Sequence, residues 1–272
     1  MAFPKIEGFV VFEKLGSGSY STVYKAYTKR QQDTHHARIK HSGSAVDNLL
    51  SEIRLLKALD HPHIVRMMDF TWDNKNIYII TEFCSGGDLS NYIQRYGRVP
   101  ERQVTYLYLF ILSGQRVVHM DLKPHNLLLH KGGDGKYILK VADFGFAAHL
   151  PGVWERGPRG SPLYMAPEML THCYDARVDL WSLGVIIYEC LFGKAPYSSA
   201  TFKQLIEKIQ TRQPIQIPPK PVISPGCREL VGRLLQHSPE DRISYEQLFA
   251  LPYLDLEHAP SISMQFIENH LK

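Results

Sequence analysis

The chain has 272 residues, 44% of them hydrophobic, so it can bury a sizeable core in one large domain or in two lobes that share a cleft. Its 31 Lys and Arg are interspersed with 27 Asp and Glu, without a basic block to follow a phosphate backbone, so we expect no nucleic-acid partner. The 4 cysteines form no close pair and no apolar run approaches the roughly 18 residues of a membrane span, so we expect a cytoplasmic chain without disulfides, a zinc site or an integral membrane segment.

Short alternating runs, typical of strands, dominate the beginning of the chain from Phe9 to Ile80. Strands are expected at residues 24–26, 37–40 and 77–80. Val46 to Leu59 interrupts them with an apolar stripe at helical spacing. We therefore predict a first lobe at residues 9–83, a small antiparallel β-sheet with one helix, which follows an N-terminal extension at residues 1–8.

The remainder is predicted to form a larger, mainly helical lobe at residues 84–255, followed by a C-terminal tail at residues 256–272. Ser85 to Asp88 marks the boundary between the lobes, because its glycines break the strand and Asp88 can cap a following helix. Helical periodicity recurs at residues 89–95, 103–112, 178–192, 201–210, 227–236 and 245–250. The proline-rich segment 213–225 predicts an extended surface loop. The fold class is therefore α+β, with two lobes.

A glycine-rich hairpin, a strand lysine and a helix glutamate follow one another in the first lobe. Gly16-Ser17-Gly18-Ser19 lies between two predicted strands, where backbone amides can approach phosphates closely. Alone, such a hairpin is more often only a tight turn. A dinucleotide-binding turn would require a helix directly afterwards. The order of the hairpin before Lys40 and Glu52 favours phosphate binding, because a buried lysine paired with a carboxylate can hold the α and β phosphates of a nucleotide.

The most specific segment runs from His119 to Asn126 and is followed by Asp143-Phe144-Gly145. In this arrangement Asp121 would accept the proton of a substrate hydroxyl or orient it, and Lys123 would neutralise charge on the moving phosphoryl group. Asn126 and Asp143 would hold magnesium through hard oxygen ligands. A polar turn between two strands, the alternative, does not account for both motifs at this separation.

Two further carboxylates are predicted to be structural. Glu168 ends the segment that begins at Asp143, which we call the activation segment, and Arg242 lies far enough along the chain to form a buried ion pair with it. Asp179 begins an apolar helix and is expected to accept backbone N–H groups of residues 119–126, which we call the catalytic loop, and these bonds would satisfy its buried charge. A simple helix cap is the alternative for Asp179.

With these motifs in order from Phe9 to Pro252, the chain resembles the protein kinase superfamily. Lys123 two places after Asp121, together with residues 160–168, resembles serine/threonine rather than tyrosine kinases. The sequence segments 76–78, 82–90, 143–147 and 174–182 are similar to those of the ULK family, and to one of its members most closely. The resemblance implies a serine/threonine protein kinase that uses ATP and Mg²⁺, acts on protein substrates and serves autophagy or hedgehog signalling.

The resemblance also implies a nucleotide site. In this site, Thr81 would lie at the entrance of the pocket behind the adenine. Glu82 and Cys84 would offer backbone groups to adenine, and Asp88 would reach the ribose. The residues assigned to this site are Leu15, Gly16, Ser17, Gly18, Ser19, Val23, Arg38, Lys40, Thr81, Glu82, Cys84, Asp88, Leu128 and Asp143.

Two positions depart from the family pattern. Met120 stands where kinases usually have Arg, whose buried charge normally needs a phosphate on the activation segment, and residues 146–160 contain no Ser, Thr or Tyr. We therefore predict activity that does not depend on phosphorylation in that stretch.

Arg38 stands where a small alanine packs on adenine, on the same strand face as Lys40. Its guanidinium could collide with the purine or stack on it.

Segments 40–52 and 100–121 are also shorter than in relatives, the latter by about a helical turn or two. Together with Arg38, and with Ser21 in place of a third glycine, they leave open a pseudokinase that binds nucleotide or partners without turnover. An active enzyme is favoured because the catalytic set is complete. That set is Lys40, Glu52, Asp121, Lys123, Asn126 and Asp143.

Overall fold

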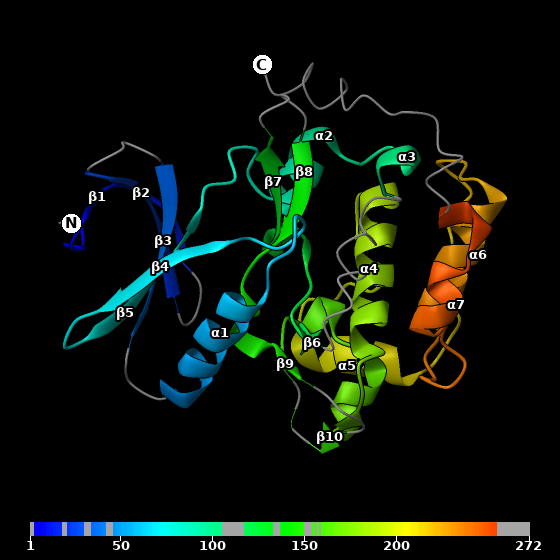
Figure 1. The fold of residues 1–272 in the computed structure, drawn as a ribbon. Coiled ribbons are helices and arrows are strands. Elements are labelled where there is room, and N and C mark those ends of the chain that lie inside the picture. The colour runs from blue at the N-terminus through cyan, green and yellow to red at the C-terminus, as the bar shows by residue number, and fades with distance from the viewer. Residues whose placement is uncertain are drawn as a thin grey trace.

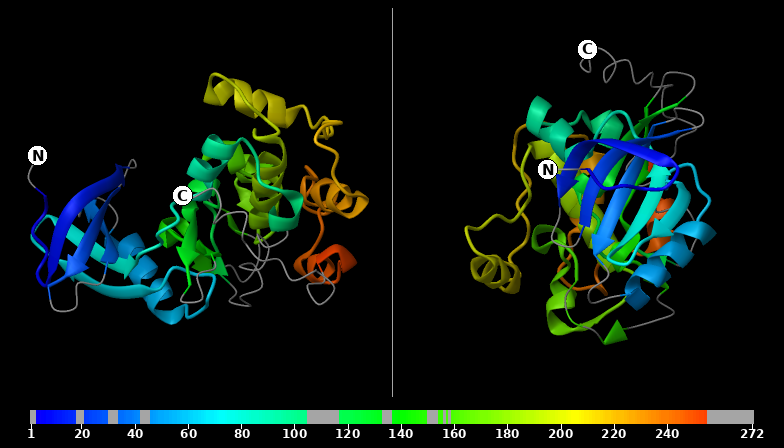
Figure 2. Two further views of the ribbon diagram at one scale, coloured as in Figure 1. Left: turned by 90° about the horizontal axis from the view of Figure 1, so that it is seen from above. Right: turned by 90° about the vertical axis from the view of Figure 1, so that its left-hand side faces the viewer.

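The computed structural model describes residues 3–17, 21–29, 34–41, 46–104, 117–132, 137–149, 154–155, 157 and 159–254. A β-sheet and a larger helical lobe lie side by side, with α1 on the side of the sheet that faces the helical lobe (Figure 1). The left-hand view of Figure 2 shows the same two bodies from above, and in the right-hand view the sheet lies in front of the helical lobe. Both lobes were predicted from the sequence.

The N-terminal lobe is a five-stranded sheet with the order β1-β2-β3-β5-β4, in which every neighbouring pair is antiparallel. Its strands are β1 (Phe9–Ser17), β2 (Ser21–Thr28), β3 (Thr34–His41), β4 (Met67–Trp72) and β5 (Asn76–Glu82), and its helix is α1 (Val46–Ala58). Because strand β2 follows the glycine hairpin directly, the dinucleotide-binding alternative is excluded. Ile6 is buried in the small core of this lobe, so the predicted N-terminal extension contributes to the fold.

The C-terminal lobe is organised around α4 (Val178–Phe192), which is hydrophobic on all sides and therefore lies inside the lobe. The other helices are α2 (Leu89–Tyr96), α3 (Glu101–Val104), α5 (Phe202–Gln210), α6 (Pro225–Leu234) and α7 (Tyr245–Phe249). Figure 1 shows β7 and β8 on one side of α4, with α6 and α7 on the other. No helix among the described residues combines the length and the apolar character that a bilayer crossing requires.

Short elements complete this lobe, and Asp121, Lys123, Asn126 and Asp143 lie within or between them. Three two-stranded pairs are formed by β6 (Val117–Val118) with β9 (Ala148–His149), β7 (Leu127–Lys131) with β8 (Tyr137–Val141), and β10 (Trp154–Glu155) with β11 (Cys173–Tyr174). The 3₁₀ turns are η3 (Pro124–Asn126), η4 (Phe144–Phe146), η5 (Pro162–Tyr164), η6 (Pro167–Thr171) and η7 (Pro252–Leu254).

The predicted helices agree with the structure in place, with differences at their ends. The helix expected at residues 103–112 begins at Glu101, and its part beyond Val104 lies outside the described residues. The helix expected at 227–236 begins earlier, because Ser224 caps it and the fixed φ of Pro225 suits the first helical position. The proline-rich segment, expected to be an extended loop, contains no helix or strand from residue 213 to Ser224.

Candidate active site

The carboxylate of Asp179 holds the backbone of the catalytic loop through two hydrogen bonds. The amide of His119 donates to its Oδ2 at 2.6 Å and the amide of Met120 donates to its Oδ1 at 2.9 Å. Complete burial raises the pKa of Asp179, and the two amide donors act against this by stabilising the carboxylate. The prediction that Asp179 accepts these backbone groups is confirmed. The loop is thereby attached to the first turn of α4, the innermost helix of the lobe.

Asp121 has two carboxylate oxygens in different situations. Its Oδ2 accepts a hydrogen bond from Nζ of Lys123 at 2.8 Å and lies 3.3 Å from Nδ2 of Asn126. Its Oδ1 is buried and has no hydrogen-bond partner among the residues that the structure describes. Because an unsatisfied buried acceptor costs free energy, this oxygen is suited to receive a proton donor from outside the chain. A substrate hydroxyl has the required chemistry.

The end of the activation segment is packed against the catalytic loop. Gly160 has φ +90°, and a Cβ on this residue would lie 2.3 Å from the carbonyl oxygen of Met120 and 3.2 Å from Oδ1 of Asp121. Only glycine fits such a close approach. The next residue, Ser161, accepts a hydrogen bond from Nζ of Lys123 at 2.7 Å. Lys123 therefore joins the catalytic carboxylate to the activation segment.

Asn126 and Asp143 are brought together by a backbone hydrogen bond, from the amide of Ala142 to the carbonyl of Asn126 at 2.8 Å. The side-chain nitrogen of Asn126 donates to the backbone carbonyl of Asp121 at 2.8 Å, so its amide oxygen is the atom that can bind a cation. Asp143 is held at φ 63° by the turn that Phe144 begins. Amide and carboxylate oxygens are hard ligands, and this donor set fits Mg²⁺.

Arg38 extends from β3 to two carboxylates. Its Nη2 forms an ion pair with Oε1 of Glu52, on α1, and its Nη1 forms one with Oδ1 of Asp143. Collision and stacking with a purine, the alternatives that the sequence left for Arg38, both stay predictions, and in the structure the guanidinium is paired with these acids. The reason is the position of α1, which presents buried Glu52 opposite the strand, and a buried carboxylate needs a cation.

Lys40 lies two residues after Arg38 in β3, with its backbone opposite Ser21 and Ile77. Its side chain lies outside the described part of the chain, so its pairing with Glu52 stays a prediction. Gly18 and Ser19 of the hairpin also lie outside the described residues. Leu15, Gly16 and Ser17 lie in β1, where Gly16 is opposite Val23 of β2.

The junction between the lobes carries the residues that were assigned to adenine and ribose. Thr81 and Glu82 end β5, and Cys84 is buried directly after them, where burial raises the pKa of its thiol to about 12. Asp88 pairs through its backbone with Leu128 of β7. The carboxylate of Asp88 caps α2 and accepts the amide of Asn91 at 2.8 Å, which confirms the predicted cap.

Lys140 is a residue of the site that sequence reasoning missed. It is buried on β8, and its Nζ donates to Oε1 of Glu82 at 2.7 Å. The same oxygen accepts the amide of Arg66 at 2.7 Å. The side chain of Glu82 thus ties the junction to both lobes. The signal in the sequence was a lysine inside the otherwise apolar strand at residues 137–141, since a buried lysine requires an acid.

The predicted ion pair between Glu168 and Arg242 is confirmed. Nη1 of Arg242 donates to Oε1 at 2.6 Å and Nη2 donates to Oε2 at 2.9 Å, so the pair is bidentate and buried. It closes the C-terminal end of the activation segment onto the helical lobe.

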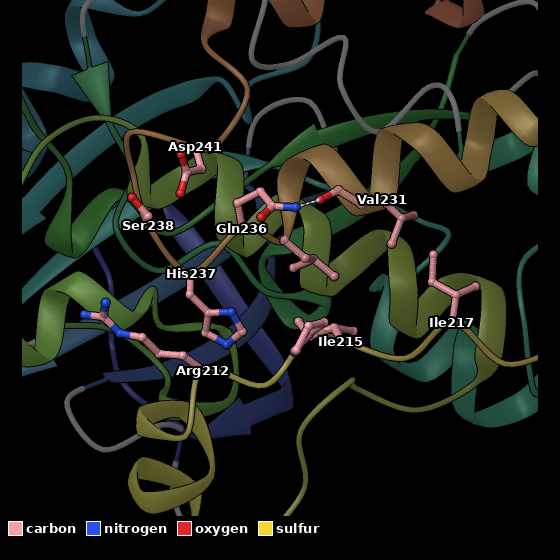
Figure 3. A pocket seen from close by; sticks show the side chains of 11 residues that line it. Arg212, Ile215, Ile217, Val231, Gln236, His237, Ser238 and Asp241 are labelled. Carbon is pink, nitrogen blue, oxygen red and sulfur yellow. Dashed lines mark hydrogen bonds between the residues drawn. The ribbon is translucent and has the colours of Figure 1, made fainter.

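A separate cavity of about 320 Å³ lies in the helical lobe (Figure 3). Its lining includes Ile215, Ile217, Val231 and His237, and Gln236 at its wall donates to the carbonyl of Gly232 at 2.6 Å. It shares no lining residue with the site above.

Comparisons with known proteins agree with this geometry. The family described as "Protein kinase domain" matches residues 9–254. The serine/threonine-protein kinase ULK3 of Homo sapiens is 48% identical over 274 residues, which cover 95% of this chain and 57% of that protein. ULK3 of Xenopus laevis is 49% identical, with 95% and 58% covered, and the serine/threonine-protein kinase ATG1c of Arabidopsis thaliana is 35% identical, with 90% and 35% covered. The chain thus spans little more than half the length of the ULK3 proteins it matches.

Proposed function

The chain belongs to the protein kinase family, with ULK and ATG1 kinases among its relatives, and from this premise we propose that it transfers the γ-phosphate of ATP to Ser and Thr hydroxyls of proteins. The observation that carries the proposal is the state of Asp121. One carboxylate oxygen is held by Lys123, and the other is a buried acceptor without a partner among the described residues. This is the arrangement that orients a hydroxyl and takes its proton.

Each remaining residue then has a definite part. Lys123 lies beside Asp121 and supplies a positive charge where the transferred phosphoryl group carries negative charge. Asn126 and Asp143 would hold Mg²⁺, which neutralises phosphate charge when bound. Asp179 keeps the loop in place, and Gly160 allows the activation segment to lie against it.

The site is proposed to work without a phosphate on residues 146–160. In support, the side chain of Met120 is buried, with 3% exposed, and brings no charge that a phosphate would have to balance. The activation segment is already attached to the catalytic loop through Lys123 and Ser161. Phosphatase treatment of the purified chain should leave its activity unchanged. Loss of activity, with the removed phosphate mapped to Ser161 or to another hydroxyl of the activation segment, would refute this part.

The cellular setting is proposed from the family relationship. Autophagy is supported by the ATG1 kinases among the relatives. Hedgehog signalling is proposed only from the resemblance of the motifs to the ULK family. A cytoplasmic location is proposed from the scattered cysteines and the lack of a long apolar run in the sequence, and regulatory protein partners are still to be identified.

The transfer reaction is tested with the purified 272-residue chain, labelled ATP, Mg²⁺ and a generic basic protein substrate. Asp143→Asn and Asp121→Asn serve as controls, because each keeps the shape of the side chain and removes its charge. Label on Ser and Thr with the unchanged chain, and its loss in both variants, is the expected result. Equal signals from all three proteins would instead favour the nucleotide-binding scaffold that the sequence left open.

A further inference from the structure

We propose that Arg38 is a built-in cation that competes with the metal ion for Asp143, and so weakens the coupling between metal binding and nucleotide binding in this chain. The inference rests on the proposed nucleotide site and concerns its regulation. It goes beyond the family pattern, because the residue that the resemblance implies at this position is a small alanine.

The two ends of the Arg38 bridge differ in burial. The side chain of Glu52 is only 1% exposed, whereas that of Asp143 is 36% exposed and that of Arg38 is 11% exposed. A carboxylate as buried as Glu52 is stable only beside a cation, so the guanidinium is anchored there. The ion pair with Asp143 is open to solvent and weaker. The bridge can therefore open at Asp143 while it stays closed at Glu52.

Arg38 and Mg²⁺ would compete for the same carboxylate. Nη1 of Arg38 is paired with Oδ1 of Asp143, which is one of the two oxygen-bearing side chains that fit the metal. A guanidinium beside this oxygen neutralises the carboxylate and repels a second cation. Asp143 would supply a negatively charged oxygen to Mg²⁺, so binding of the ion there would compete with the ion pair to Nη1.

The same charge favours nucleotide in the absence of metal. Because Arg38 stays attached to Glu52, a positive charge remains beside the proposed triphosphate site whether or not metal is bound. Arg38 should therefore strengthen metal-free nucleotide binding and weaken the further gain that the metal brings. These two effects have opposite signs, which distinguishes them from a loss of fold.

The test measures the dissociation constant of ATP by calorimetry, once with Mg²⁺ and once with a chelator, in the unchanged chain and in Arg38→Ala. The dissociation constant with the chelator divided by the one with Mg²⁺ is the metal coupling. Linkage makes this ratio independent of the order of binding. We expect Arg38→Ala to raise this ratio roughly fivefold, through weaker metal-free binding and tighter binding with Mg²⁺. Unfolding temperature without ligands checks that the variant is folded.

Two further variants keep the outcome decisive. Arg54→Ala removes a charge from an exposed position on α1, near Glu52 in sequence, and should leave the ratio unchanged. Arg38→Lys keeps one cation but lacks the fork that reaches both acids, and should give an intermediate ratio, which also serves if Arg38→Ala does not fold. An unchanged ratio in the folded Arg38 variants, or an equal rise in Arg54→Ala, would overturn the inference alone. Failure of the unchanged chain to bind ATP under either condition would overturn the proposed nucleotide site together with it.

Discussion

Nζ of Lys123 donates a hydrogen bond to Oγ of Ser161 at 2.7 Å, across 38 residues of sequence, while it also holds Oδ2 of Asp121 at 2.8 Å. The catalytic loop and the end of the activation segment therefore share one cation. The position of Lys123 depends on both partners, so a change at Ser161 should be felt in the transfer step.

Replacement of Ser161 by Ala should lower kcat roughly five- to tenfold, because Lys123 loses one of its two fixed partners while its contact with Asp121 remains. The KM for ATP should change little. Ser161→Thr is the matched control, since it retains the hydroxyl, and it should keep most of the activity. Equal losses in the two variants would show that the hydroxyl does not position Lys123.

Gly160→Ala should lower kcat roughly a hundredfold, because its Cβ would displace the backbone of Met120 and with it Asp121. An alanine at the positive φ of this position would also add strain of about 1–3 kcal/mol to the folded state. Gly232→Ala is the control, since a Cβ at this position in α6 meets no atom within 4 Å. It should keep full activity and be more stable by about 0.5–1 kcal/mol. Comparable activity of the two variants would contradict the predicted clash.

Arg242→Leu should lower the free energy of unfolding by about 3–5 kcal/mol, because it leaves the carboxylate of Glu168 buried without its cation. The comparison is Arg233→Leu, which removes an exposed ion pair with Glu229 and should cost no more than about 0.5 kcal/mol. Urea unfolding of both variants measures the difference. Similar midpoints would show that the buried pair adds nothing beyond a surface pair.

Asp73 gives a prediction for the dependence of stability on pH. The hydroxyl of Tyr78, first, and the amides of Lys75 and Asn76 donate to its carboxylate and lower its pKa from 3.8 to about 2. These hydrogen bonds to the charged carboxylate therefore stabilise the folded chain above pH 4, and this stabilisation is lost as the pH falls toward 2. The difference in free energy of unfolding between the unchanged chain and Asp73→Asn should be largest above pH 4 and should narrow below it. A difference that stays constant from pH 6 to pH 2 would show that these hydrogen bonds do not favour the charged form.

Contacts could be predicted from the sequence where a local motif defines them or where a buried charge needs a partner. The carboxylate of Asp179, the ion pair of Glu168 with Arg242 and the cap at Asp88 belong to this group. Strand alternation also placed Arg38 on the face that it occupies. Alternation gives a face but no partner, however, and the partners of Arg38 depend on where α1 lies relative to β3.

Contacts between distant elements were missed for the same reason. Glu101 accepts the amide of Ser224 at 2.9 Å, across 123 residues, and so links the start of α3 to the cap of α6. Lys140 and Glu82 are linked in a similar way between β8 and the end of β5. The lysine in the apolar strand at residues 137–141 indicates that Lys140 needs an acid but not which one, and Glu101 and Ser224 have no local pattern, because each pair is formed only when the lobes and helices have packed.

The attachment of His119 and Met120 to Asp179 has a consequence for motion. Their amides bond to a carboxylate on α4, whose residues Leu180, Leu183 and Ile186 are 0% exposed. Local opening requires segments with few buried contacts, and α4 is the opposite of such a segment. These two amides should exchange with solvent only when the entire helical lobe unfolds, so we expect Asp121 to keep its position during any local opening elsewhere in the chain.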